Sequence, residues 1–340
     1  MNVKDDPSNE EISELQALLE RQEQEIVSLR DSRNSTIRKL HKAKLKVIKP
    51  SDEILKMAAN ASPMVDVFFD LLGEDKEAIG EIISTIIGVH VRVLNTVPQY
   101  SISNVGSMGV RLDNYSENVV EAELLEDSDV FGEKGTLVDI EVQNEKDDLD
   151  FRAFYNGASM IINKTPPKTL YKDLPHAIVI CISSYDPYGD GEVLYENIVA
   201  DKKTGKKRRS PLAEYFVNTD NLDRFLNAPD LRENKVAALM KVFRDADWYD
   251  EQFPAFSARK KLIHETSEGV MEVSKELQLI VNEQLKLIMD EQVKKANEQA
   301  EQTRIADMRN IKKATGWTTQ ETLEVLKIPM EHWSRYSNCI

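Results

Sequence analysis

Cysteine is scarce in this chain of 340 residues, which contains only Cys181, inside an apolar run, and Cys339 near its end. Two cysteines so placed exclude a disulfide framework in practice and fit a reducing compartment, so a cytoplasmic location is expected. No run of 18 apolar residues occurs, which argues against a transmembrane helix and a membrane partner. The first ten residues are acidic and polar, unlike a secretory signal.

Basic residues are also fewer than acidic ones: the chain has 44 Lys and Arg and 59 Asp and Glu, so its formal net charge is −15. Such a chain lacks the overall electrostatic footprint of a nucleic-acid-binding protein. Basic residues are nevertheless concentrated at 38–49 and at 202–209, with six Lys or Arg in each stretch. A local basic stripe can hold phosphates on an acidic protein, although the affinity is weak and sensitive to salt.

Several common site motifs are missing. The five histidines are isolated from one another, so no metal-binding histidine pair is present. There is no G-x-S-x-G sequence, no P-loop and no dinucleotide fingerprint. The loop 186–191 superficially resembles a calcium loop, but Tyr188 stands where a ligand is needed, so a tight turn is expected.

The most informative pattern lies between residues 110 and 155. Residues 138–143 alternate strictly between apolar and polar, which predicts a strand with Asp139, Glu141 and Gln143 on one face. Residues 110–113 alternate in the same way and place Asp113 on the polar face. Apolar residues then recur at helical spacing, which predicts a helix after the second strand; they are Phe151, Phe154, Tyr155, Ala158 and Ile162.

Carboxylates on neighbouring strands have two interpretations. Mg²⁺ prefers a few carboxylate ligands and retains several waters, so two such strands can supply an open site for phosphodiester hydrolysis. The alternative is a half-buried hairpin whose acidic face is solvated, and the alternation alone favours it. The ordered set of strand, strand and helix favours the metal site.

This ordered set resembles the PD-(D/E)XK nuclease superfamily, in the branch of transposase-like, recombination-promoting nucleases. Members carry a Leu-Asp strand, an Asp-Ile-Glu-x-Gln strand, and a helix with Arg and Tyr near its start. The matching residues here are Leu112-Asp113, residues 139–143, and Arg152 with Tyr155. The resemblance covers roughly residues 60–220. It implies an α/β fold with a mixed-sheet, restriction-endonuclease-like core, flanked by long helical N- and C-terminal extensions.

By this resemblance, Asp113 and Glu141 would bind Mg²⁺ or Mn²⁺, and Asp139 would support them or supply a further ligand. Gln143 would orient the attacking water or a phosphate oxygen, at a position where most of the superfamily has Lys. Arg152 would contact phosphate. An acidic residue of a preceding helix, Asp66 or Asp70, could add a ligand, although an exposed carboxylate is the commoner interpretation.

The chain departs from the family pattern in three places. Gln143 brings no positive charge, Asp70 stands where Lys is frequent, and an acidic insertion at residues 116–134 replaces a short connection. An insertion of this length beside a site could form a lid or a strand pair, and its charge would repel DNA.

Three segments are expected. Residues 1–50 read as a helix with imperfect heptads, which predicts a coiled coil or a solvated helix. Residues 51–225 would form the nuclease-like domain, and residues 226–340 a helical region. Both terminal regions carry sparse apolar seams, so a homo-oligomer through the terminal helices is expected.

Two functions from different classes follow. The first is a Mg²⁺-dependent DNA endonuclease in which Asp113, Glu141 and Gln143 are catalytic. DNA would be held by Arg152 and by a basic hairpin tip, which comprises Lys206, Lys207, Arg208 and Arg209; a solvated turn is the alternative for the tip. The second is a catalytically weak or inactive relative that acts as a helical protein-interaction module.

Overall fold

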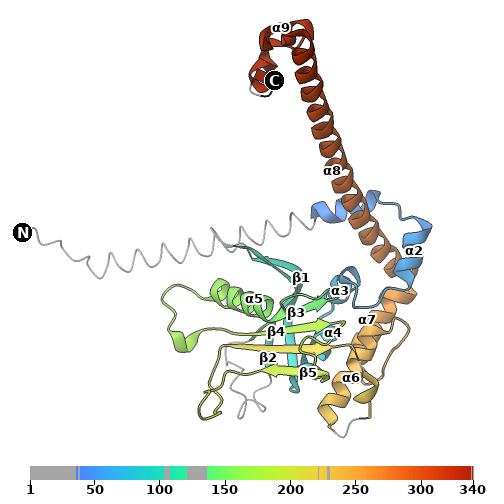
Figure 1. Cartoon of the computed structure of the whole chain (residues 1–340). Coiled ribbons are helices and arrows are strands. Elements are labelled where there is room, and N and C mark those ends of the chain that lie inside the picture. The colour runs from blue at the N-terminus through green and yellow to red at the C-terminus, as the bar shows by residue number, and fades with distance from the viewer. Residues whose placement is uncertain are drawn as a thin grey trace, which may run out of the picture. The chain divides into compact units, whose positions relative to one another are not determined.

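A six-stranded mixed sheet forms the core of the protein, as the computed structural model shows (Figure 1). The structure describes residues 36, 39–102, 108–120, 136–220, 222–227, 230–337 and 339. The strand order is β1-β2-β3-β4-β6-β5. The strands are β1 (Val91–Ile102), β2 (Val110–Val120), β3 (Thr136–Gln143), β4 (His176–Ser183), β5 (Leu194–Asn197) and β6 (Leu212–Asn218). The predicted mixed α/β class is confirmed.

The sheet changes direction in its middle. Strands β1, β2 and β3 form an antiparallel meander, whereas β3, β4 and β6 run parallel and β5 closes the edge antiparallel to β6. Parallel neighbours need a crossover, and α5 (Leu149–Lys164) supplies it between β3 and β4. Strand β4 is buried along residues 177–183, as its continuous apolar run predicts.

Helices cover both faces of this sheet. Alternate residues of β4 enter different apolar clusters, with Ile178, Ile180 and Ile182 on one face and Ala177, Val179 and Cys181 on the other. The first face is covered by α3 (Asp66–Leu72), α4 (Lys76–Ile87), α6 (Leu231–Arg244) and α7 (Pro254–Glu265). The second face is covered by α5.

The chain divides into two compact units, residues 1–278 and 279–340. The predicted boundary after residue 225 therefore differs from the structure, because α6 and α7 belong to the first unit. Val236, Leu239 and Phe256 are fully buried in the same cluster as β4, so these helices complete the core of the sheet. Helix α2 (Asp52–Ala59) also precedes the sheet within this unit.

The second unit is helical, as predicted. It contains the C-terminal part of α8 (Ser267–Thr315), followed by α9 (Thr319–Val325) and α10 (Trp333–Ser337). The predicted capping box is present, since Thr318 and Glu321 bind each other's backbone N–H groups. Met308, Leu323, Ile328 and Tyr336 form a small apolar cluster. A short 3-10 helix at Met330–His332 also belongs to this unit, whereas those at Tyr171–Asp173 and Leu222–Arg224 belong to the first unit.

The N-terminal coiled-coil prediction rests on residues 12–35, which lie outside the described residues. Within the part that the structure describes, no helix combines the length and apolar character that a bilayer-spanning segment needs.

Helix α7 carries a lysine into the core. Lys260 is 0% exposed, and its Nζ lies 2.8, 2.6 and 2.8 Å from the carbonyl oxygens of Val242, Asp245 and Trp248. These carbonyls end α6 and begin the following connection, so three acceptors satisfy the three donors of the ammonium group. Burial lowers the pKa of Lys260 to about 8. The cost of burying the charge is offset by the three hydrogen bonds.

Candidate functional site

Asp113 and Glu141 meet where the β2–β3 ladder ends. Paired positions run from Asn118 opposite Thr136 to Asn114 opposite Ile140, and Asp113 and Glu141 come next on the two strands. The backbone N–H of Asp113 donates to Glu141 Oε1 at 3.1 Å. The N–H of Val142 donates to Asp113 Oδ2, also at 3.1 Å. Each carboxylate therefore binds the backbone of the opposite strand in place of a ladder hydrogen bond.

The polar face of β3 is buried, because α5 lies over it. Asp139 is 0% exposed and Glu141 is 1% exposed. The alternation correctly predicts a strand, but the alternative interpretation of a solvated acidic face is wrong for these two residues. Buried carboxylates are costly unless partners compensate them, so their contacts are informative.

Arg152 of α5 is the main partner of Glu141. Its Nε lies 3.0 Å from Glu141 Oε2, and its Nη1 donates to Gln143 Oε1 at 3.0 Å. Asp147 Oδ2 lies 3.5 Å from the same Nη1. The other end of the Gln143 amide donates to the carbonyl of Glu145 at 2.9 Å. Gln143 is thus fixed at both ends, with its oxygen on the guanidinium.

Burial and crowding raise the pKa values of these acids. Burial raises the pKa of Glu141 to about 7; the Asp113 charge adds to the rise, and Arg152 opposes it. Burial likewise raises the pKa of Asp113, against the hydrogen bond from Val142. The pKa of Asp139 lies well above its ordinary value because of burial and the charges of Glu141 and Asp113. Strongly perturbed acids in one place are typical of functional sites.

Asp139 lies on the same face of β3 as Glu141, one step farther from the end of the ladder. It stands opposite Tyr115, deeper in the sheet, and its Oδ2 accepts a hydrogen bond from Asn156 Nδ2 at 3.1 Å. Sequence reasoning missed Asn156, although it follows Arg152 by four residues and therefore shares its side of α5. Asp139 therefore neighbours Glu141 and is also bound by Asn156 of α5.

Helix α3 contributes a third acidic region. Asp70 is half-buried, and its Oδ1 accepts a hydrogen bond from Gln99 Nε2 at 2.6 Å. Burial raises the pKa of Asp70 to about 7, and the Asp113 charge contributes to the rise. Asp66 is exposed, as the commoner interpretation expected, whereas Asp70 is not. No sequence signal connects Gln99 with Asp70, because the two residues meet only through the fold.

The donor set fits a metal bound by two carboxylates. Among the described residues, no group of three or more His, Cys, Asp or Glu side chains is arranged to hold a metal ion. Mg²⁺ in proteins commonly uses one or two carboxylates and keeps several waters, so Asp113 and Glu141 satisfy the smaller requirement. Because Arg152 already lies on Glu141 Oε2, a cation bound there would have to displace the guanidinium.

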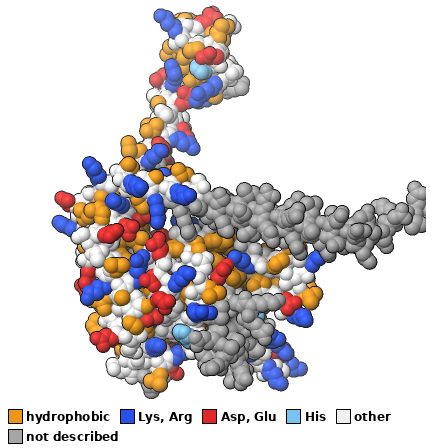
Figure 2. All heavy atoms as spheres, turned by 180° about the vertical axis from the view of Figure 1, so that it is seen from behind, with side chains coloured by type: hydrophobic (Ala, Val, Ile, Leu, Met, Phe, Trp, Pro, Cys, Tyr) orange, Lys and Arg blue, Asp and Glu red, His pale blue; other side chains and the backbone are white. Residues whose placement is uncertain are grey.

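The predicted DNA-binding residues are not brought together. The site lies near the end of the strands where Gln143, Ser183 and Asn218 align. The basic tip precedes Leu212, at the opposite end of β6, roughly 20 Å away along six strand residues. Lys and Arg side chains gather at the lower edge of the molecule in Figure 2, where the β5–β6 connection projects. Arg152 alone of this set lies at the site.

The acidic insertion also attaches far from the site. Strand β2 continues to Val120, so residues 116–120 of the predicted insertion are strand, and residues 121–135 lie outside the described residues. Both attachment points adjoin the Asn118–Thr136 pair, at the other end of the hairpin from Asp113 and Glu141. The insertion therefore leaves and rejoins the sheet at the end of the hairpin opposite to Asp113 and Glu141.

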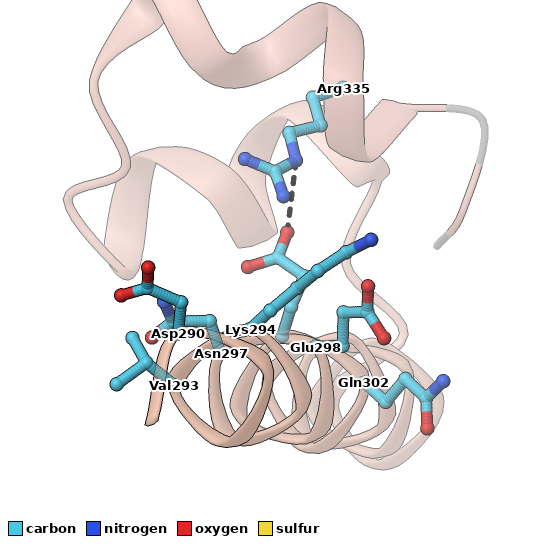
Figure 3. Close-up of a pocket in the computed structure, with 8 residues that line it drawn as sticks. Asp290, Val293, Lys294, Asn297, Glu298, Gln302 and Arg335 are labelled. Atoms are coloured by element: carbon cyan, nitrogen blue, oxygen red, sulfur yellow. Dashed lines mark ion pairs between the residues drawn. The ribbon is translucent and has the colours of Figure 1, made fainter. Parts of the chain in front are cut away.

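The C-terminal unit has a hollow of its own, between α8 and the segment that carries Arg335 (Figure 3). The ion pair of Arg335 Nε with Glu301 Oε1, at 3.2 Å, crosses it. Polar and charged side chains form most of the wall, and none of the predicted site residues is among them.

Comparison of the chain with protein-family models finds no match. Comparisons with curated proteins and with solved structures likewise find no significant match.

Proposed function

We propose that this protein is a metal-dependent endonuclease that cleaves DNA phosphodiesters, with a PD-(D/E)XK-like core of the transposase-like, recombination-promoting type. The main support is that Asp113 and Glu141 lie side by side at the end of the β2–β3 ladder, where each carboxylate accepts a hydrogen bond from the backbone of the other strand. The order of Asp113 on β2, Glu141 on β3 and Arg152 on α5 supports the proposal. Cleavage assays with and without Mg²⁺ test it.

In the proposed mechanism, Asp113 and Glu141 would hold Mg²⁺ or Mn²⁺, and the ion would supply charge neutralisation at the phosphoryl group and a water of lowered pKa. Both carboxylates are fixed by backbone N–H groups, so little rearrangement of the strands is required. Arg152, once displaced from Glu141, is placed to bind a phosphate oxygen. Gln143 would have to exchange its contact with Arg152 or with the Glu145 carbonyl to orient water or phosphate, and it contributes no charge, so the rate should be low.

A catalytically weak or inactive relative that binds other proteins is the rival function. One specific observation favours it: Arg152 already occupies Glu141 Oε2, and Gln143 accepts from the same guanidinium. The net charge of −15 points the same way. In this rival function, Asp113 and Glu141 bind no metal, and Arg152 stabilises the buried Glu141. Activity of the natural sequence with Mg²⁺ would exclude the rival.

DNA contact by the basic tip can be tested through salt dependence. Lys206, Lys207, Arg208 and Arg209 are all exposed, with one ion pair of 3.6 Å between Arg208 and Asp201. Replacing all four by Ser should flatten the plot of log K against log salt by about 0.9 per lost phosphate contact. The quantity to measure is the affinity for duplex DNA at several salt concentrations.

A matched control for the tip replaces Lys42, Lys44, Lys46 and Lys49 by Ser, which removes the same charge from the other basic stretch. If only the tip variant changes the slope, the tip contacts DNA. An unchanged slope in the tip variant would identify a solvated hairpin end.

Self-association through the terminal helices is a further part of the proposal, as is a cytoplasmic location. In α8, the side chains of residues 282–300 are all exposed, including Leu285, Ile288 and Val293. An isolated helix gains little stability by itself, so apolar side chains on such a segment favour a partner helix.

A further inference from the structure

Helix α5 is apolar on the side that faces away from the sheet. Its inner side buries Leu149, Ala153, Asn156, Gly157 and Met160. Its outer side presents Phe151, Phe154 and Ile162, which are 77%, 61% and 72% exposed. This face belongs to the helix that Figure 1 shows beside β3 and β4. The predicted helix is confirmed. Three of the apolar residues that predicted it, Phe151, Phe154 and Ile162, lie on its outer side and not against the sheet.

Such a helix is unusual at a surface. A surface helix normally places charged residues opposite its buried stripe, whereas a helix that is apolar all round is buried on both sides. Asp150, Arg152 and Lys164 are the charged residues of α5. At 100° per residue, none of them falls on the stripe of Phe151, Tyr155, Ala158 and Ile162. The outer side therefore has the composition of an interface.

The spacing of this stripe is the same from either end. Steps of four, three and four residues separate its members, with large side chains at the two ends and the small Ala158 near the middle. A twofold axis between residues 156 and 157 would set Phe151 opposite Ile162. Between them it would set Tyr155 opposite Ala158; both are half-buried, and the Tyr155 hydroxyl already binds the Met108 carbonyl. Self-complementarity of this kind is what an isologous interface requires.

Charge at the two ends of α5 is complementary in the same sense. Residues 144–150 contain four carboxylates and one lysine. Residues 164–173 contain three lysines and one aspartate, although Lys164 already pairs with Glu117 of the same chain. The same twofold axis sets Glu145 opposite Lys168, and both side chains are exposed. The acidic end would repel a phosphate backbone, so DNA is a poor occupant of this face.

We infer that the outer side of α5 is a homodimer interface, in which a second copy of the chain packs its own α5 antiparallel about a twofold axis. Leu170 and Tyr171, which are 60% and 93% exposed, extend the apolar surface beyond the C-terminal end of α5. The inference is independent of the proposed nuclease function. It is also distinct from association through the terminal helices.

Sedimentation velocity of the full chain over a concentration range tests the interface. The natural sequence should sediment as a dimer at about 50 µM, and Phe151→Asp should raise the dissociation constant at least about 100-fold, because each dimer loses two buried apolar side chains. The matched control is Leu231→Asp at the start of α6, which is 84% exposed and should leave the dimer intact. Circular dichroism checks that both variants keep their fold.

A charge exchange tests the antiparallel arrangement. Lys168→Glu and Glu145→Lys should each weaken the dimer, and the double variant should restore it, because the two residues face one another across the axis. A monomeric natural protein at that concentration overturns the inference, as does a Phe151→Asp variant that dimerises as strongly as the natural protein and the Leu231→Asp control. Failure of the double variant to restore the dimer overturns the antiparallel arrangement.

Discussion

Asp113→Asn and Glu141→Gln are each expected to abolish Mg²⁺-dependent DNA cleavage while leaving the fold intact. Under the proposed function, each variant removes one of two ligands of the same ion. Metal catalysis supplies several kcal/mol of transition-state stabilisation, so cleavage should fall by about a thousandfold or more. The measurement is the single-turnover rate on supercoiled DNA, with and without Mg²⁺.

Metal binding can be measured apart from cleavage. Mg²⁺ at 100 times its dissociation constant should stabilise the natural protein by about 2.7 kcal/mol and raise its melting temperature accordingly. Neither variant should respond. Glu117→Gln is the matched control. Glu117 lies on β2, like Asp113, but its side chain pairs with Lys164 at 2.7 Å, away from the site. Equal stabilisation of the natural protein and Glu141→Gln by Mg²⁺ would remove the metal site from the proposal.

Gln143→Lys separates the two candidate functions. An ammonium at this position restores the charge that most of the resembled superfamily carries, so an active nuclease should retain or increase its cleavage rate. In an inactive relative, the natural protein would not cleave DNA. The variant would also place two cations, Arg152 and the new Lys, around Glu141.

The metal-free protein should lose stability as pH rises from 5 to 8, and Glu141 should cause much of that loss. The pKa of Glu141 rises from 4.5 to about 7 on folding. The folded state therefore binds more protons than the unfolded state between these values, so unfolding becomes easier as pH increases. The loss from this residue should be on the order of 2–3 kcal/mol.

Glu141→Gln isolates that contribution. The amide carries no charge, so the variant should become more stable relative to the natural protein as pH rises through 7. Chemical denaturation at pH 5, 6, 7 and 8, without metal, gives the difference directly. Parallel pH profiles for the two proteins would show that Glu141 is already ionised at pH 5.

Strands β2 and β3, with Asp113 and Glu141 on their polar faces, could be predicted from the sequence, because a period of two fixes which residues share a face. Strand β1 was not predicted. The burial of Glu141 could not be predicted, because it depends on α5 folding back over β3. Alternation looks the same whether the polar face meets water or a helix. Helix α5 itself was predicted, but two apolar sides left no signal for which side faces inward.

Other contacts depend on register and on distant segments. Asp70 and Gln99 are 29 residues apart, and their hydrogen bond exists only once β1 lies beside α3. The position of the basic tip follows from the antiparallel pairing of β5 with β6, which reverses the chain away from the site. Helices that complete a sheet core resemble independent helices in composition, so the sequence does not show that α6 and α7 pack with the sheet.

The buried Lys260 makes the connection between α6 and α7 measurable by its chemistry. An amine reagent cannot reach a side chain that is 0% exposed and bound to three carbonyls, whereas the adjacent Lys261 is 60% exposed. Reaction at Lys260 therefore requires that this connection opens, while Lys261 reports the intrinsic reactivity of an amine. The ratio of the two labelling rates gives the free energy of local opening, without any substitution in the chain.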